Sequence, residues 1–177
     1  MTTSFIDNYR FLARYNSWMN QRLYAACNTL TDAQRKADQG AFFKSVQHTL
    51  THLVLADKIW LARFARQGVE FAALGSELLT MPQGSDYTSD LYPDWTELTQ
   101  TRDAMDAAIE QWLADMSPEF LTSTMRYANT KGVQRAHPAW QALTHLFNHQ
   151  THHRGQVTTL LTQAGVDVGV TDLIALI

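Results

Sequence analysis

The residues of this chain best suited to chemistry are the histidines of one short stretch, HLFNHQTHHRGQ, residues 145–156. The chain has 7 histidines, and this stretch holds His145, His149, His152 and His153. No proline follows for many residues, so the stretch is predicted to be helical. Residues four apart share one face of a helix, which makes His145/His149 and His149/His153 candidate chelating pairs.

A helical wheel separates the four histidines into two groups. At about 100° per residue, the apolar stripe of this segment consists of Leu143, Leu146, Val157, Leu160 and Leu161. His153 falls inside the stripe and His149 at its edge, whereas His145 and His152 face the polar side. One core-facing histidine is often only a hydrogen-bonded structural residue, but two at ligand spacing favour a metal site. Two imidazoles on one helix bind a metal weakly, so a third ligand is expected from elsewhere.

A second predicted helix carries the candidates for that third ligand. It follows Ser45, a suitable N-cap, and ends near Gly68. His48 and His52 lie together on a face beside its main apolar stripe, so either side chain could reach the core. His52 lies nearer the middle of the helix and is the preferred ligand.

The remaining periodic segments complete an all-α fold, an up-down four-helix bundle with long loops. A first helix is expected over about residues 4–30, capped by Thr3 or Ser4, with Cys27 as a small buried residue near its end. The histidine helix is expected to close at Gly165, and the apolar tail that follows is expected to dock on the bundle.

A third helix is expected to begin at Pro93–Asp94 and to end at Ser117–Pro118. Its carboxylates are predicted to form a solvated face, and they are Glu97, Asp103, Asp106, Glu110 and Asp115. Residues 69–92 predict a long connection with one short helix. The stretch around 129–132 predicts a small β-hairpin or an extended loop before the last helix, where His137 has a structural role.

Composition limits the classes of function. The length of 177 residues predicts one domain over residues 1–177, and 45% hydrophobic with 18% charged residues is ordinary for a globular protein. A net charge of −3 without a basic run disfavours nucleic-acid binding. The single cysteine excludes an internal disulfide and a thiolate metal cluster. Without a signal peptide or a membrane span in the sequence, a cytoplasmic location is expected.

The hypothesis that follows is a metal site of His52, His149 and His153 in the bundle core. Three neutral imidazoles suit zinc, nickel or another borderline divalent ion. Three protein ligands leave at least one coordination position open, which is typical of catalytic sites, whereas structural zinc sites are closed by four. Such an ion lowers the pKa of a bound water towards ~7 or deprotonates a bound thiol.

Three familiar types of site do not fit. Residues 149–153 have the histidine spacing of a zincin peptidase, but Gln150 stands where the general-base glutamate is needed. A di-iron bundle would need Glu-x-x-His motifs, and the chain has none. A serine hydrolase would need a G-x-S-x-G nucleophile elbow, which is also missing.

The chain resembles the DinB family, the damage-inducible metal-binding four-helix bundles. The resemblance lies in three segments, NHQTHHRGQ (148–156), THLVLADKIWLARF (51–64) and YNSWMNQRLY (15–24), and extends to GAFFKS and GVDVGVTDL. The family's metal ligands are one histidine of the second helix and an H-x-x-x-H pair of the last. These match His52, His149 and His153, the same three that the helical wheel selects.

The resemblance implies more than the spacing shows. Members are commonly homodimers, and relatives include S-transferases and isomerases that use a low-molecular-weight thiol such as bacillithiol or mycothiol. Because the same triad serves different reactions, it does not select a substrate. Arg154, Gln156 and His48 are candidates to contact a substrate or to orient the ligands. Gly155, unfavourable within a helix by about 1 kcal/mol, suggests the close approach of another backbone.

Three functions compete at this point. The first is a metal-dependent enzyme acting on a small molecule, a thiol S-transferase or a metal-assisted hydrolase. The second is a non-catalytic, stress-related dimeric bundle in which the metal serves stability or a partner. The third is a helical dimerisation module with surface histidines.

Overall fold

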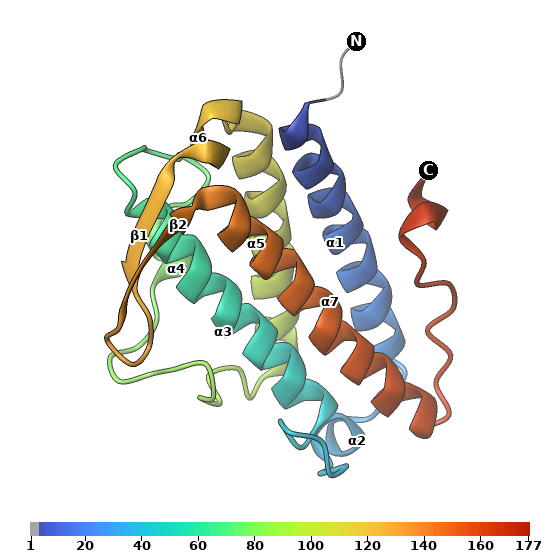
Figure 1. Cartoon of the computed structure of the whole chain (residues 1–177). Coiled ribbons are helices and arrows are strands. Elements are labelled where there is room, and N and C mark those ends of the chain that lie inside the picture. The colour runs from blue at the N-terminus through green and yellow to red at the C-terminus, as the bar shows by residue number, and fades with distance from the viewer. Residues whose placement is uncertain (1–3) are drawn as a thin grey trace.

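Four long helices lie side by side and form the body of the molecule (Figure 1). The computed structural model describes residues 4–177. The four helices are α1 (Phe5–Cys27), α3 (Val46–Ala65), α5 (Trp95–Asp115) and α7 (Ala139–Gln163). Helices α1 and α3 each pack against both α5 and α7. The predicted four-helix bundle is therefore confirmed.

Side-chain caps explain where two of these helices begin. The Ser45 hydroxyl accepts a hydrogen bond from the backbone N–H of His48 (3.1 Å), and the Asp94 carboxylate accepts one from that of Glu97 (2.8 Å). The N-cap of α1 is Ser4, whereas Thr3, the alternative cap, lies outside the described residues. Pro93 precedes the N-cap Asp94 and therefore lies outside the first turn of α5, where the sequence had placed it.

Short elements connect the bundle. Helix α4 (Ser76–Leu79) is the short helix expected in the long connection, and strands β1 (Thr124–Ala128) and β2 (Gln134–Pro138) form the expected hairpin. Helices α2 (Asp32–Lys36) and α6 (Pro118–Thr122) were not predicted, because single-turn helices leave too short a periodic pattern.

The hairpin pairs its strands in antiparallel register, with Tyr127 opposite Arg135. Directly opposed residues have their side chains on the same face of a two-stranded sheet. His137 of β2 lies 3.2 Å from the Tyr127 hydroxyl through its Nε2 atom, which agrees with a structural role. The hairpin lies beside α3 and leads directly into α7 (Figure 1).

The C-terminal end of α7 closes as the sequence predicts. Gly165, at φ +78°, directly follows the C-cap Ala164, and the next backbone N–H, of Val166, bonds back to the carbonyl of Leu161 at 2.9 Å. The tail then docks on α1, where the Tyr15 hydroxyl donates to the carbonyl of Thr171 at 2.6 Å. The short 3-10 helix Leu173–Leu176 ends it.

Two apolar clusters fill the bundle, one toward each end. Between them lies a layer of buried polar side chains contributed by all four long helices, namely Asn16, Asn20, Asp57, Arg102, Asp106, Gln150 and Arg154. Asp106 was expected on the solvated face of α5, and that prediction is wrong. Its carboxylate is buried because the guanidinium of Arg102, one turn earlier on the same helix, lies 2.8 Å away.

Two further expectations have clear outcomes. Cys27 is fully buried, and burial raises the pKa of its thiol to about 12, so it behaves as the small core residue that was expected. Across residues 4–177, none of the helices is both long and apolar enough to span a membrane.

Candidate metal centre

Three histidine side chains from two neighbouring helices meet at mid-bundle. His52 comes from α3, and His149 and His153 come from consecutive turns of α7. One ring nitrogen of each lies within 4.8 Å of the other two, a set that could hold a metal ion. The Nε2 atoms of His52 and His149 are 3.2 Å apart, close to the ~3.3 Å expected between two ligands of a tetrahedral zinc ion.

Hydrogen bonds on the far side of two rings fix which nitrogen is free. The Nδ1 atom of His52 lies 2.8 Å from the backbone carbonyl of Tyr87, which can only accept a hydrogen bond. The Nδ1 atom of His153 lies 2.8 Å from the side-chain oxygen of Gln156. Both Nδ1 atoms therefore carry the proton, and both Nε2 atoms keep their lone pairs. Metal-binding histidines typically have such acceptors behind them.

The three imidazoles are neutral at physiological pH. Burial lowers the pKa of His52 to about 4 and, together with the neighbouring imidazoles, that of His149 to about 3. Burial also lowers the pKa of His153. Only a neutral imidazole can donate a lone pair to a metal, so the site is in its ligating form without having to lose protons. The donor set and its geometry fit a borderline divalent ion.

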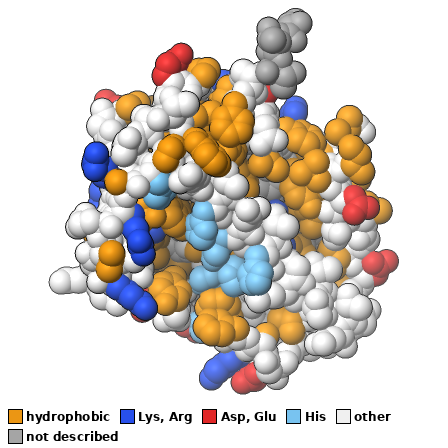
Figure 2. Space-filling model, in the orientation of Figure 1, with side chains coloured by type: hydrophobic (Ala, Val, Ile, Leu, Met, Phe, Trp, Pro, Cys, Tyr) orange, Lys and Arg blue, Asp and Glu red, His pale blue; other side chains and the backbone are white. Residues whose placement is uncertain are grey.

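A cavity of about 420 Å³ opens beside His52 and His149. Helix α3 supplies Trp60 and Arg63 to its wall, and the hairpin and its turn supply Tyr127, Asn129, Thr130 and Arg135. In the space-filling view, histidines gather around a hollow on this face, and basic side chains border the hollow on the side of the hairpin (Figure 2). The three-histidine cluster is thus open to a space of ligand size.

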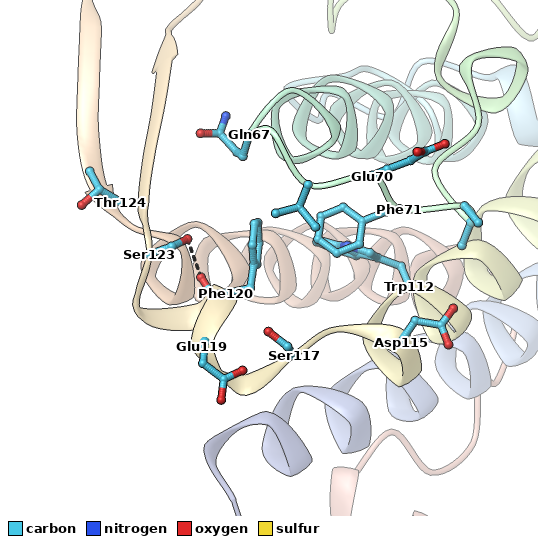
Figure 3. Close-up of a pocket in the computed structure, with 13 residues that line it drawn as sticks. Gln67, Glu70, Phe71, Trp112, Asp115, Ser117, Glu119, Phe120, Ser123 and Thr124 are labelled. Atoms are coloured by element: carbon cyan, nitrogen blue, oxygen red, sulfur yellow. Dashed lines mark hydrogen bonds between the residues drawn. The ribbon is translucent and has the colours of Figure 1, made fainter.

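A second cavity, of about 600 Å³, lies at the C-terminal end of α5 (Figure 3). Aromatic side chains of Phe71, Trp112 and Phe120 form its wall, and the carboxylates at it belong to Glu70, Asp115 and Glu119. Its lining contains no histidine, lysine or arginine. It therefore lacks the side chains that would make it part of the metal centre.

The whole chain matches one family of known proteins. The family model described as "DinB family" covers residues 1–177. The chain belongs to the DinB family. It is similar to the protein named Protein DinB of Bacillus subtilis (strain 168), with 26% identity over 164 residues, which are 91% of this chain and 88% of that protein.

A solved structure supports the same fold. The chain superposes with a TM-score of 0.60 on a DinB-like protein of Bacillus cereus ATCC 10987, known from a crystal structure at 2.01 Å resolution. The superposition covers 90% of this chain and 94% of that one, at 23% sequence identity. At that identity the likeness concerns the fold, so the chemistry of this DinB-family chain must be argued from its own residues.

Other histidines of this DinB-family chain lie around the three without joining them. His48, the alternative third ligand, is one turn before His52, and its Nε2 atom lies 3.2 Å from the backbone carbonyl of Thr88. His152 is exposed. His145 lines the cavity next to His149, with 5.7 Å between ring centroids.

Of the residues predicted to surround the ligands, one contacts a ligand and another faces away from the cavity. Gln156 contacts His153 directly, as described above. Arg154 faces the core and not the cavity, where its guanidinium donates to the side-chain oxygens of Asn16 and Asn20. Gly155 is exposed, and a Cβ atom added to it would meet no described atom within 4 Å. The expected close approach of another backbone to Gly155 is therefore not found within this chain.

Two residues near the ligands were missed by sequence reasoning. The Phe43 ring stacks on the His52 imidazole, with 4.0 Å between centroids, and meets His153 edge-on at 5.5 Å. Phe43 belongs to the GAFFKS segment on which the resemblance partly depends, and this was its only signal. Tyr87 contributes a backbone carbonyl, and a sequence carries no side-chain signal for such a contact.

Proposed function

We propose that this chain is a divalent-metal-dependent enzyme that activates a thiol for transfer to an electrophile. The observation that carries the proposal is the convergence of His52, His149 and His153 beside an open cavity. A structural zinc site is usually closed by four protein ligands, whereas a catalytic one usually has three and leaves room for a reactant.

Each residue of the site has a definite task in this proposal. The three histidines hold the ion, which would lower the pKa of a thiol entering from the cavity. The Tyr87 carbonyl and the Gln156 side chain keep two of the imidazoles in the ligating tautomer and orientation. Phe43 covers His52 and His153 with an apolar ring, which keeps water from that side of the site. A metal-assisted hydrolase would use the same ligands with water in place of the thiol.

The first experiment is elemental analysis of protein purified without an affinity tag. We expect about one zinc, nickel or similar ion per chain, strongly reduced in His149→Ala and retained in the control His152→Ala. Wild type loaded with the metal should then consume an electrophile such as 1-chloro-2,4-dinitrobenzene in a thiol-dependent way. Metal-free wild type, even after reconstitution, would overturn the ligand assignment.

A non-catalytic role for the same metal is the second candidate. The ligands come from α3 and α7, so an ion would connect two helices of the bundle and stabilise it without chemistry. This candidate expects a large fall in the melting temperature on chelation, together with no thiol-dependent turnover. Turnover that disappears in His149→Ala and persists in His152→Ala would instead favour the enzyme.

A further inference from the structure

The wall of the cavity that contains the histidines also carries two guanidinium groups. Arg63 of α3 lies between two aromatic rings, with its central carbon 4.6 Å from the centroid of Trp60 and 4.8 Å from that of Tyr127. Arg135 is the cross-strand partner of Tyr127, so its side chain lies on the same face of the hairpin. Both arginines line the cavity.

These two positive charges have no acidic partner. The ion pairs found within residues 4–177 involve other arginines and lysines, and the cavity lining contains no aspartate or glutamate. Burial lowers the pKa of Arg63, so its partly desolvated charge has an unfavourable cost that a bound anion would offset. Stacking on two rings holds the guanidinium in place while its N–H edges remain available.

The rest of the wall suits an organic stem. Trp60, Tyr87 and Tyr127 line the same space as the arginines and the histidines, and the hairpin turn adds the polar residues Asn129 and Thr130. A volume of about 420 Å³ is within the usual range of small-molecule sites. The cavity thus has three zones in one space, the histidines, the aromatic wall and the arginines.

We propose that this cavity takes a small organic carboxylate whose anionic group lies against Arg63 and Arg135 and whose other end reaches His52 and His149. The inference rests on the proposed function for the end at the histidines, where the substrate's thiol would lie. The guanidinium groups are donors with the planar geometry that a carboxylate accepts. The two arginines would then determine specificity by selecting anionic over neutral substrates.

The test compares two thiols that differ only in charge, 4-(mercaptomethyl)benzoate and 4-(mercaptomethyl)benzamide. Calorimetric titration of the zinc-loaded protein gives both affinities. We expect the wild type to prefer the carboxylate at least about tenfold, and expect high salt to reduce this preference. Arg63→Gln and Arg135→Gln should each bring the preference close to unity, whereas Arg63→Lys should retain part of it.

Matched controls come from the neighbouring arginines. Arg66 is the C-cap residue of α3, three positions after Arg63, and Arg126 precedes Tyr127 on β1 and faces the other side of the hairpin. Neither lines this cavity, so Arg66→Gln and Arg126→Gln should preserve the preference. Arg135 is exposed on the hairpin, so its variant should fold even if Arg63→Gln does not.

A titration with the same two thiols, followed by absorption, separates this inference from the proposed function. In the cobalt-substituted protein, a thiol that reaches the histidines gives a thiolate-to-cobalt absorption band. A carboxylate preference that depends on Arg63 and Arg135 supports the anion site even without that band, and the missing band would then contradict thiol activation alone. Equal affinities in the wild type, or a preference that survives both Arg→Gln variants, would overturn the anion site.

Discussion

The three histidines and the buried charged layer lie at the same level of the bundle, and on α7 they occupy adjacent positions. On α7, His149 is followed by Gln150 and His153 by Arg154. One residue of each pair belongs to the three-histidine cluster and the other to the charged layer, because neighbouring residues on a helix point about 100° apart. Two polar regions with different arrangements of their polar groups therefore lie next to each other.

The interior region pairs opposite charges within the chain. Asp57, which is 0% exposed, accepts from Arg102 at 2.7 Å and from Gln150 at 2.6 Å. Asp106 accepts from Asn20 at 2.9 Å and lies beside Arg102. Burial opposes the charge of Arg102, but the two carboxylates still keep its pKa above the ordinary value. Burial raises the pKa of Asp106 against the attraction of Arg102.

The histidine region is the opposite case, since its ring nitrogens face one another, with the Nε2 atoms of His52 and His149 3.2 Å apart, and not an oppositely charged group. The carboxylates of the layer have their cation, Arg102, within the chain, although Asp57 Oδ1 and Arg102 Nε are buried without a hydrogen-bond partner. The three histidines instead lie beside an open cavity, with ring nitrogens close enough to share a metal ion. The difference teaches that burial of polar groups alone does not mark a functional site. The mark is the convergence of several ring nitrogens that could share one ion, next to an open cavity.

The largest expected effect comes from breaking the charged layer. Asp57→Ala leaves the buried guanidinium of Arg102 without one carboxylate and the Gln150 amide without its acceptor. We expect the free energy of unfolding to fall by about 3–5 kcal/mol, measured by urea denaturation. Asp115→Ala, on the exposed end of α5, is the control and should change it by less than about 0.5 kcal/mol. Equal effects of the two substitutions would mean that the layer does not stabilise the fold.

The histidine site should respond to metal where the charged layer does not. With free zinc at a hundred times its dissociation constant, the unfolding free energy of the wild type should rise by about 2.7 kcal/mol. This gain should vanish in His149→Ala and remain in His152→Ala. Urea denaturation with and without zinc measures it, and a gain that persists in His149→Ala would place the ion elsewhere.

The contrast also explains what the sequence could predict. Periodic apolar residues predicted the four long helices, and the wheel of α7 separated His149 and His153, which meet in the cluster, from the exposed His152. The wheel also placed His145 on the polar side, yet His145 lines the cavity beside His149. These predictions depend on one helix at a time. Predicting the third ligand required knowing that α3 lies next to α7. The sequence favoured His52 over His48 only because His52 is nearer the middle of its helix.

The charged layer escaped prediction for a physical reason. A polar residue that faces a buried partner on another helix has the same periodicity as one that faces water, so Asp106 was placed on a solvated face. The available signal was the repetition of polar residues one turn apart, at Asn16/Asn20, Arg102/Asp106 and Gln150/Arg154. Each pair interrupts an apolar stripe at the same depth of the bundle, which a single-helix analysis does not reveal.

A pH titration of the metal-free protein sharpens the comparison further. The ordinary pKa of histidine is 6.5, and the folded values are about 4 for His52 and about 3 for His149. Below pH 6.5 these histidines therefore bind protons in the unfolded chain but not in the folded one. We expect stability to be retained above pH 6.5 and to fall as the pH drops toward 4.

The size of this fall is measured against a variant. His149→Leu removes one of the histidines with a lowered pKa, so the wild type should lose on the order of 1–2 kcal/mol more than the variant between the two pH values. This expected energy is smaller than the full pKa shift of His149 would give, because the half-buried side chain keeps some contact with water. Urea denaturation across the pH range provides the comparison, and parallel curves would contradict the depressed pKa of His149.

The smallest expected effect concerns the acceptor behind His153. Gln156→Leu removes the oxygen that receives the Nδ1 proton of that ring, 2.8 Å away, so the imidazole loses both its orientation and its fixed tautomer. We expect zinc affinity to fall about 10-fold or more while the charged layer and the folding of the metal-free protein remain intact. Competition with a chromogenic chelator measures the affinity, and Gln163→Leu at the exposed end of α7 is the control. If the two leucine variants bind zinc equally well, the orientation of His153 must come from Phe43 and the packing of α7 instead.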